Sequence, residues 1–181
     1  NAEEELTYAA LQARMNRSGN VMRSLGVERG DRVLIRSTNA PEIIAIILGC
    51  LKLGAVPMAV SSLFRSDELG FILQNSEAKV AVSTQALAGP LREVSSSAPS
   101  LQVLATLGGA QKGDVALEPL LADASDRLDT VDTSKDDAAF IFYTSGTSGN
   151  PKGICHAHHY LIGSLDPISR FFIDMQPHER M

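Results

Sequence analysis

The chain has 181 residues, of which 44% are hydrophobic and 20% are charged, and its formal net charge is −5. This composition is typical of a globular domain that buries a sizeable core. An acidic chain without a block of Lys or Arg is not expected to bind nucleic acid. The chain has no run of eighteen apolar residues and no basic-then-apolar leader, so we expect neither a membrane span nor export. With only Cys50 and Cys155 present, we expect a reducing, cytoplasmic compartment.

The first part of the chain alternates segments of helical and strand periodicity. Helices are predicted at residues 7–25, 41–53, 67–75 and, more weakly, 87–97. Strands are predicted at residues 32–36, 55–60, 79–82 and 101–105. Thr7, Asn39 and Ser66 are the expected helix caps, while Gly26 and Gly54 are expected to end two of the helices. The helix at 41–53 is apolar almost all round, which predicts burial on more than one side.

This alternation recurs every twenty to thirty residues, which favours right-handed βαβ units. The expected fold is therefore α/β, with a mostly parallel sheet covered by helices on both faces. Residues 106–137 are predicted to form a loop-rich connection within the same domain, with a short helix near 117–124. The acidic positions of this segment do not have the spacing of a calcium loop, so a solvated linker is favoured over a divalent-ion site. These positions are Asp123, Asp126, Asp129, Asp132, Asp136 and Asp137.

A buried strand is predicted at Ala138–Tyr143, and the segment that follows it has a very different composition. From Thr144 to Lys152 the residues are hydroxyl-bearing, Gly, Asn, Pro and finally Lys. Glycines allow backbone N–H groups to converge, and hydroxyls and an ammonium complete a surface suited to a polyphosphate. A solvated linker has a similar composition, but a linker needs neither a buried strand before it nor a lone Lys after it. The spacing fits neither the Walker phosphate loop nor the dinucleotide-binding glycine pattern.

Tyr143-Thr-Ser-Gly-Thr-Ser-Gly-Asn-Pro-Lys-Gly153 resembles the Y-T-S-G-T-[TS]-G-x-P-K-G loop of the adenylate-forming, or AMP-binding, enzymes at eleven consecutive positions. In that family the loop closes over the phosphates of ATP while a carboxylate attacks. The resemblance implies that Lys152 is catalytic. It also implies that ATP phosphates are held by Thr144, Ser145, Gly146, Thr147, Ser148, Gly149 and Lys152. Hydroxyls, backbone N–H groups and a mobile cation are suitable partners for phosphoryl oxygens.

A returning strand is expected at residues 153–156, followed by a helix over 158–172 that is bent at Pro167. Cys155, His156 and His158 lie close in sequence, but they lack the two spaced pairs of a structural zinc site, so no metal site is predicted. Family members often have a histidine at the position of His158. This residue is therefore either close to the acyl substrate or a helix-start histidine with a local partner.

Shorter matches in the first half of the chain extend the resemblance to nearly all 181 residues. The family continues further, with an adenine- and Mg²⁺-binding segment, a ribose-binding Asp and a small domain bearing a catalytic Lys, and none of these motifs is found here. We therefore expect residues 1–181 to be the N-terminal portion of an AMP-binding domain, without the C-terminal domain.

The implied parent is an ATP-dependent carboxylate–CoA ligase that uses ATP, Mg²⁺ and coenzyme A on a small-molecule carboxylic acid, with this portion alone inactive. Two alternatives stay open. One is a non-catalytic nucleotide- or phosphate-binding module. The other is the adenylation domain of a peptide synthetase.

Overall fold

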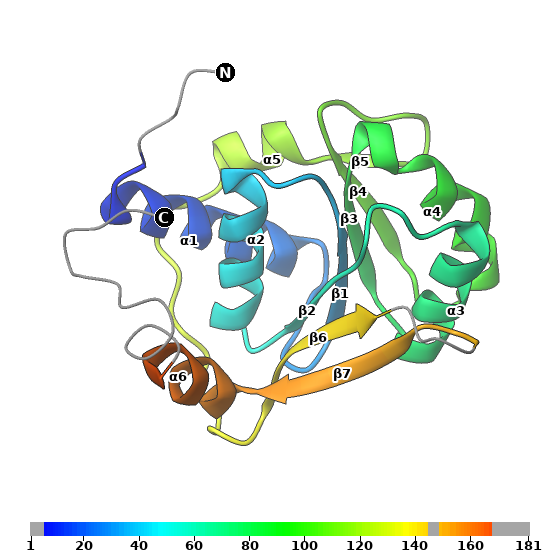
Figure 1. The fold of residues 1–181 in the computed structure, drawn as a ribbon. Helices are drawn as coiled ribbons and strands as arrows, with labels where there is room; N and C mark the ends of the chain where they lie inside the picture. The colour runs from blue at the N-terminus through cyan, green and yellow to red at the C-terminus, as the bar shows by residue number, and fades with distance from the viewer. Residues whose placement is uncertain (1–5, 145–148, 168–181) are drawn as a thin grey trace.

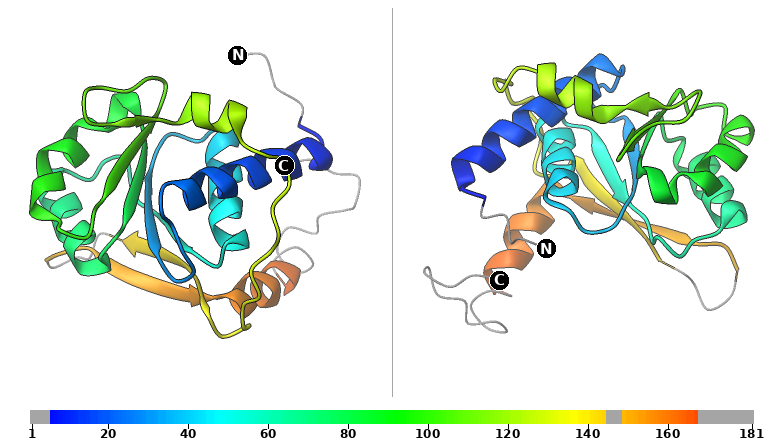
Figure 2. Two further views of the ribbon diagram at one scale, coloured as in Figure 1. Left: turned by 180° about the vertical axis from the view of Figure 1, so that it is seen from behind. Right: turned by 90° about the horizontal axis from the view of Figure 1, so that it is seen from above.

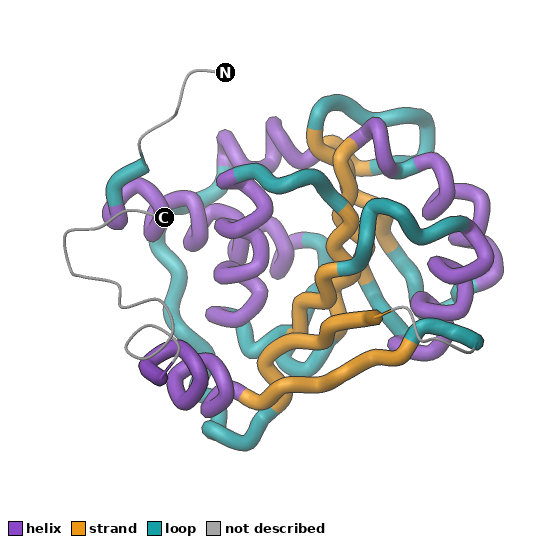
Figure 3. The backbone as a smooth tube through the Cα atoms, in the orientation of Figure 1, coloured by secondary structure: helices purple, strands orange, loops and turns teal. Residues whose placement is uncertain are grey.

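The computed structural model describes residues 6–144 and 149–167. A seven-stranded sheet crosses the middle of the molecule, in the order β5-β4-β3-β1-β2-β6-β7 (Figures 1 and 3). Its strands are β1 (Arg32–Arg36), β2 (Val56–Ala59), β3 (Val80–Thr84), β4 (Val103–Leu107), β5 (Val115–Ala116), β6 (Ala138–Thr144) and β7 (Lys152–Ala157). All neighbouring strands pair in parallel except β6 and β7, which form an antiparallel hairpin at one edge. The predicted α/β fold is thus confirmed, and β5 is a strand that the sequence pattern did not indicate.

Helices cover both faces of the sheet, as predicted (Figures 1 and 2). The α-helices are α1 (Tyr8–Ser24), α2 (Pro41–Lys52), α3 (Ser66–Ser76), α4 (Gly89–Val94), α5 (Leu117–Asp123) and α6 (His158–Pro167). One core cluster joins the sheet to α1, α2 and α5, with Met22, Ile46 and Leu117 at its centre. A second cluster joins the other face to α3 and α4, and it includes Leu34 and Leu73. The expected burial of α2 on more than one side is confirmed, because it packs between α1 and the sheet.

The ends of α1 follow the sequence closely. The Thr7 hydroxyl accepts a hydrogen bond from the N–H of Ala10 at 3.2 Å, as expected of an N-cap. Gly26 has a φ of +87°, and its N–H donates to the carbonyl of Arg23. A residue with a side chain is strained in this left-handed conformation, so glycine is well suited to end the helix.

The predicted caps of α2 and α3 were wrong. Ala40, not Asn39, is the N-cap residue of α2, and no side-chain hydrogen bond caps it. At α3 the helix already includes Ser66, whose hydroxyl donates to Glu93 instead. The carboxylate of Glu68 accepts from the N–H of Arg65 at 2.8 Å. The start of α3 is therefore capped by the carboxylate of Glu68, which satisfies the free N–H of Arg65, and not by the hydroxyl of Ser66.

The single helix predicted at residues 87–97 was also wrong. The structure has a short 3₁₀ turn at Gln85–Leu87, the six-residue helix α4 and a second 3₁₀ turn at Ser95–Ser97. Pro90 lies in the first turn of α4, where it favours a helix start, and serine side chains compete for backbone hydrogen bonds at the other end. These local preferences divide the segment.

The connection over residues 106–137 is attached to the domain more firmly than a solvated linker. The side chain of Asn16 donates to the carbonyl of Asp126 at 2.7 Å, and Leu128 is buried in the first core cluster. Asp137, one of the acidic positions, accepts a hydrogen bond from Arg29 at 2.7 Å. Asp123, Asp126, Asp129, Asp132 and Asp136 are exposed, as predicted for a solvated segment, whereas Asp137 is half-buried and paired with Arg29. The segment is therefore solvated at most of its acidic positions but attached to the domain through Asp126, Leu128 and Asp137.

Candidate phosphate-binding site

The segment singled out in the sequence joins the two strands of the edge hairpin. Strand β6 lies beside β2 and ends at Thr144, at the carboxyl edge of the parallel sheet. The chain returns as β7, and Lys152 is the direct cross-strand partner of Thr144. Both ends of the connecting segment are thus held at one point of the sheet by the antiparallel ladder. Ligands of open α/β sheets bind outside the carboxyl ends of the strands, which is where this segment begins.

Three of the seven predicted phosphate-binding residues lie within the described part of the chain. These are Thr144, Gly149 and Lys152. Ser145, Gly146, Thr147 and Ser148 lie outside the described residues. The hairpin brings Thr144 and Lys152 together at its end, so a hydroxyl and an ammonium belong to the same cross-strand pair.

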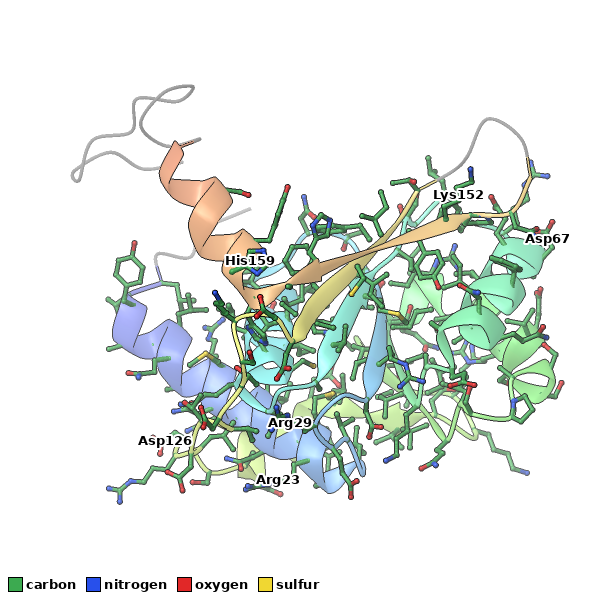
Figure 4. The ribbon with its side chains drawn as sticks, turned by 90° about the horizontal axis from the view of Figure 1, so that it is seen from below. Arg23, Arg29, Asp67, Asp126, Lys152 and His159 are labelled. Carbon is green, nitrogen blue, oxygen red and sulfur yellow. The ribbon has the colours of Figure 1, made fainter. Side chains whose placement is uncertain are left out.

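Lys152 is exposed, and no described carboxylate or carbonyl lies within hydrogen-bonding distance of its ammonium group. In Figure 4 it lies at the same end of the molecule as Asp67 of α3, whereas His159 lies at the far end of the hairpin. A lysine without a protein partner is a mobile point charge that is available to an anionic ligand. The site therefore has an available cation where the sequence predicted one.

Gly149 and Gly153 are glycines for two different reasons. Gly149 has a φ of +108°, and a Cβ atom there would meet nothing within 4 Å, so its conformation, rather than lack of space, favours glycine. Gly153 lies opposite Tyr143 in the ladder. A Cβ atom on Gly153 would lie 2.9 Å from Cζ of the Tyr143 ring, too close for an ordinary contact.

The Tyr143 ring is held firmly in this position. Its side chain packs in the core cluster below α3, and its hydroxyl donates to Oδ1 of Asn75 at 2.7 Å. Burial raises the pKa of this phenol, so the group stays a neutral hydrogen-bond donor. Tyr143 thus anchors the start of the predicted phosphate loop to α3, while Gly153 leaves space for the ring.

A hollow of about 370 Å³ lies between the returning limb of the loop and the start of α3. Gly149, Asn150 and Pro151 line one side of this hollow. The other side consists of Arg65, Asp67 and Glu68 at the start of α3. The segment that follows β2 therefore forms the wall that faces the described end of the loop.

The opposite face of the hairpin presents an aromatic cluster that the sequence pattern did not predict. The rings of Phe140 and His156 stack at 4.7 Å, and His156 lies 4.3 Å from the ring of Tyr160. Phe142 is 46% exposed, so the prediction of a strand buried throughout was wrong for this face. Side chains alternate along β6, and only the face with Tyr143 packs against a core cluster. Residues 138–143 are all apolar or aromatic, so the sequence contained no alternation of polar and apolar residues that could have indicated the exposed face.

Cys155, His156 and His158 do not form part of a metal site among the described residues. Within residues 6–144 and 149–167, no group of three His, Cys, Asp or Glu side chains is placed to hold a metal ion. His158 begins α6, and its backbone N–H donates to the carbonyl of Asp137 at 3.1 Å. Its Nε2 atom is buried without a hydrogen-bond partner among the described atoms. Proximity of His158 to an acyl substrate stays a prediction.

The comparisons with known proteins show the family that the sequence motif resembles. The family model described as "AMP-binding enzyme" matches residues 1–181. The chain belongs to the AMP-binding enzyme family. It is 35% identical to the benzoate–CoA ligase of Thauera aromatica over 91% of this chain, and 37% identical to the acetyl-coenzyme A synthetase of Bacillus subtilis over 88% of it.

A likeness to a solved structure supports the same fold. The anthranilate CoA ligase AuaEII, solved in complex with anthranoyl-AMP, superposes with a TM-score of 0.86 at 26% identity over 92% of this chain. The match covers 33% of that structure, and the matches to the benzoate–CoA ligase and the acetyl-coenzyme A synthetase cover 31% and 28% of those proteins. This AMP-binding chain thus spans about a third of the length of its relatives. Within the described residues, no helix is long and apolar enough to cross a membrane.

Proposed function

We propose that this AMP-binding chain is the N-terminal portion of a longer ATP-dependent carboxylate–CoA ligase, and that its hairpin loop holds the phosphates of ATP. The observation that carries the proposal is the eleven-residue sequence motif 143–153, whose described ends Thr144 and Lys152 pair at the carboxyl edge of the sheet, with no described residue bonded to the Lys152 ammonium. Relatives named as benzoate–CoA ligase and acetyl-coenzyme A synthetase support a CoA ligase. They differ in the acid they are named for, so the proposal specifies a small-molecule carboxylic acid and no narrower class.

In the proposed reaction, a carboxylate oxygen attacks the α-phosphorus of ATP, and the bond from that phosphorus to the bridging oxygen breaks. Pyrophosphate leaves and an acyl-adenylate forms. The thiol of coenzyme A then loses its proton and attacks the acyl carbon, releasing AMP and giving the thioester. The first step brings an anion towards a polyanion, so cationic and hydrogen-bonding groups at the phosphates lower its barrier.

The residues of this chain fit the phosphate end of ATP. Lys152 supplies a positive charge, the Thr144 hydroxyl supplies a hydrogen-bonding group beside it, and the backbone around Gly149 is not crowded by a side chain. Mg²⁺ bound with ATP would offset further phosphate charge. No step is assigned to a metal ligand of this chain, since the described residues contain no carboxylate cluster for one. We further propose that the longer protein is cytoplasmic and that residues 1–181 alone do not catalyse the reaction.

The direct test is carboxylate-dependent exchange of pyrophosphate into ATP by the longer protein. Replacing Lys152 with Ala removes the available cation at the loop end, and we expect the exchange rate to fall about a hundredfold. Lys112→Ala is the matched control, since Lys112 is also an exposed lysine but follows β4 rather than β6. An unchanged exchange rate in Lys152→Ala would contradict the assignment of Lys152.

A second measurement separates the alternatives. If free coenzyme A accepts the acyl group, the protein is a CoA ligase, whereas transfer only to a carrier-protein thiol would indicate a peptide synthetase domain. Calorimetric titration of the 181-residue chain with ATP and Mg²⁺ addresses the non-catalytic module. Binding in the micromolar range, together with an absence of exchange activity in the longer protein, would favour that reading.

A further inference from the structure

Arg36 is a buried cation in the middle of the sheet. It is the last residue of β1, the strand between β2 and β3, and only 4% of its surface is exposed. One terminal nitrogen of its guanidinium group donates to the carbonyls of Ser62 and Phe64, both at 2.8 Å. The other donates to the carbonyl of Leu87 at 3.1 Å. One side chain thus joins the segment that follows β2 to the segment that follows β3.

The environment of Arg36 is unusual for a buried charge. Among the described residues no carboxylate lies within ion-pair distance of it, and its Nε atom has no hydrogen-bond partner. Burial lowers the pKa of the guanidinium, although arginine keeps its proton in proteins. Burying a cation without a carboxylate partner costs stability, and among the described residues three carbonyl dipoles offset the charge of Arg36. A residue chosen for core stability at this position would be apolar, as Leu34 is on the same face of β1.

The position of Arg36 in the topology suggests what it does instead. From β2 to β5 the strand order is β2-β1-β3-β4-β5, which is a doubly wound sheet whose order reverses between β1 and β3. The crevice at the carboxyl ends of those two strands is where such sheets often bind a ligand. Here Arg36 bridges the crevice by bonding to Leu87 on one side and to Ser62 and Phe64 on the other.

The segment that Arg36 holds leads directly to the candidate site. Phe64 is followed by Arg65, which starts the wall of the hollow opposite Gly149 and Pro151. The bonds from Arg36 to the carbonyls of Ser62 and Phe64 therefore fix the backbone one residue before that wall. A shift of this segment would change the spacing between α3 and the described end of the loop.

We propose that Arg36 is a positioning residue for ATP binding: its guanidinium fixes the segment after β2 so that the start of α3 is correctly placed against the returning limb of the phosphate loop. The inference rests on the proposed function, because it assigns ATP to the loop. It adds a residue whose described hydrogen bonds go to the main-chain carbonyls of Ser62, Phe64 and Leu87, and which acts through them. Only arginine has a planar fork of five N–H donors that reaches three carbonyls on two segments.

The test is steady-state kinetics of the longer protein with Arg36→Met, which keeps an unbranched side chain about as long as the aliphatic stem of arginine and removes the guanidinium donors. Arg32→Met is the matched control. Arg32 lies on the same strand and also donates to main-chain carbonyls, those of Ser76 and Glu77, but at the opposite end of β1. We expect Arg36→Met to raise the KM for ATP ten- to a hundredfold, as misplacement of a binding group does, with the KM for the carboxylic acid little changed. Arg32→Met should leave both values unchanged.

Arg36→Lys guards against a variant that does not fold. A lysine has three donors on one nitrogen and can bond to one of the two segments, so we expect a KM for ATP between those of the wild type and Arg36→Met. If folded Arg36→Lys and Arg36→Met both bind ATP normally, or if Arg32→Met raises the KM for ATP equally, the positioning role is wrong. Absence of exchange activity in the wild type would instead overturn the proposed function, so the two failures can be told apart.

Discussion

Replacing Gly153 with Ala tests why the last glycine of the motif is needed. The new Cβ atom would lie 2.9 Å from Cζ and 3.2 Å from Cε1 and Cε2 of the Tyr143 ring. The ring cannot simply move away, because it is packed in the core and its hydroxyl is bonded to Asn75. Either the ring shifts and weakens that hydrogen bond, or β7 moves away from β6.

The expected magnitude follows from two opposing terms. Overpacking of this kind costs about 1 to 3 kcal/mol. Replacing Gly with Ala also reduces the entropy of the unfolded chain, which stabilises the protein by about 0.4 to 1 kcal/mol where the conformation is tolerated. The φ of Gly153 lies outside the left-handed region, so no strain term is added. We therefore expect Gly153→Ala to lower the free energy of unfolding by about 1 to 2 kcal/mol.

The measurement is equilibrium urea unfolding followed by circular dichroism, since the chain has no Trp for fluorescence. The same substitution in a Tyr143→Leu background is the control, because the shorter side chain removes the ring that the new methyl group meets. There we expect Gly153→Ala to cost much less. An equal cost in both backgrounds, or a more stable Gly153→Ala single variant, would refute the assigned contact.

Two further predictions concern stability elsewhere in the fold. In α2 a Cβ atom on Gly49 would lie 2.6 Å from a backbone nitrogen of α1, whereas in α3 the nearest atom to a Cβ on Gly70 is 3.6 Å away. Thermal unfolding should therefore show that Gly49→Ala is destabilised and that Gly70→Ala is neutral or stabilised by up to about 1 kcal/mol. Equal effects of the two substitutions would contradict the close contact between α1 and α2. Hydrogen bonds from Arg92 lower the pKa of Asp114. The ionised carboxylate therefore stabilises the fold at pH values above the ordinary pKa of an aspartate, and this stabilisation is lost as the pH falls below about 4. Asp114→Asn should cost about 1 to 3 kcal/mol near neutral pH, and a cost that does not shrink in acid would refute the pairing.

Much of the local structure could be predicted from the sequence. The Thr7 cap, the stop at Gly26 and the bounds of β1 depend on periodicity and turn chemistry within a few residues. The alternation of strands and helices predicts a parallel sheet, because a helical crossover returns the chain to the same end of the sheet before the next strand begins. The hairpin ending in Thr144 and Lys152 follows from a strand, a glycine-rich segment and a second strand.

The sequence by itself thus determined the fold class, the family motif and the place of its lysine. Only the tertiary structure decided which strands are neighbours, and with them the bridge that Arg36 makes to the segments after β2 and β3. It also decided that Tyr143 lies over Gly153 and that the other face of β6 presents Phe142 to solvent. These features join residues far apart in the chain or on adjacent strands, and local periodicity does not encode which surfaces will meet. A buried arginine that bonds to main-chain carbonyls at the end of an otherwise buried strand is not explained by local sequence patterns, and a functional role is to be sought there.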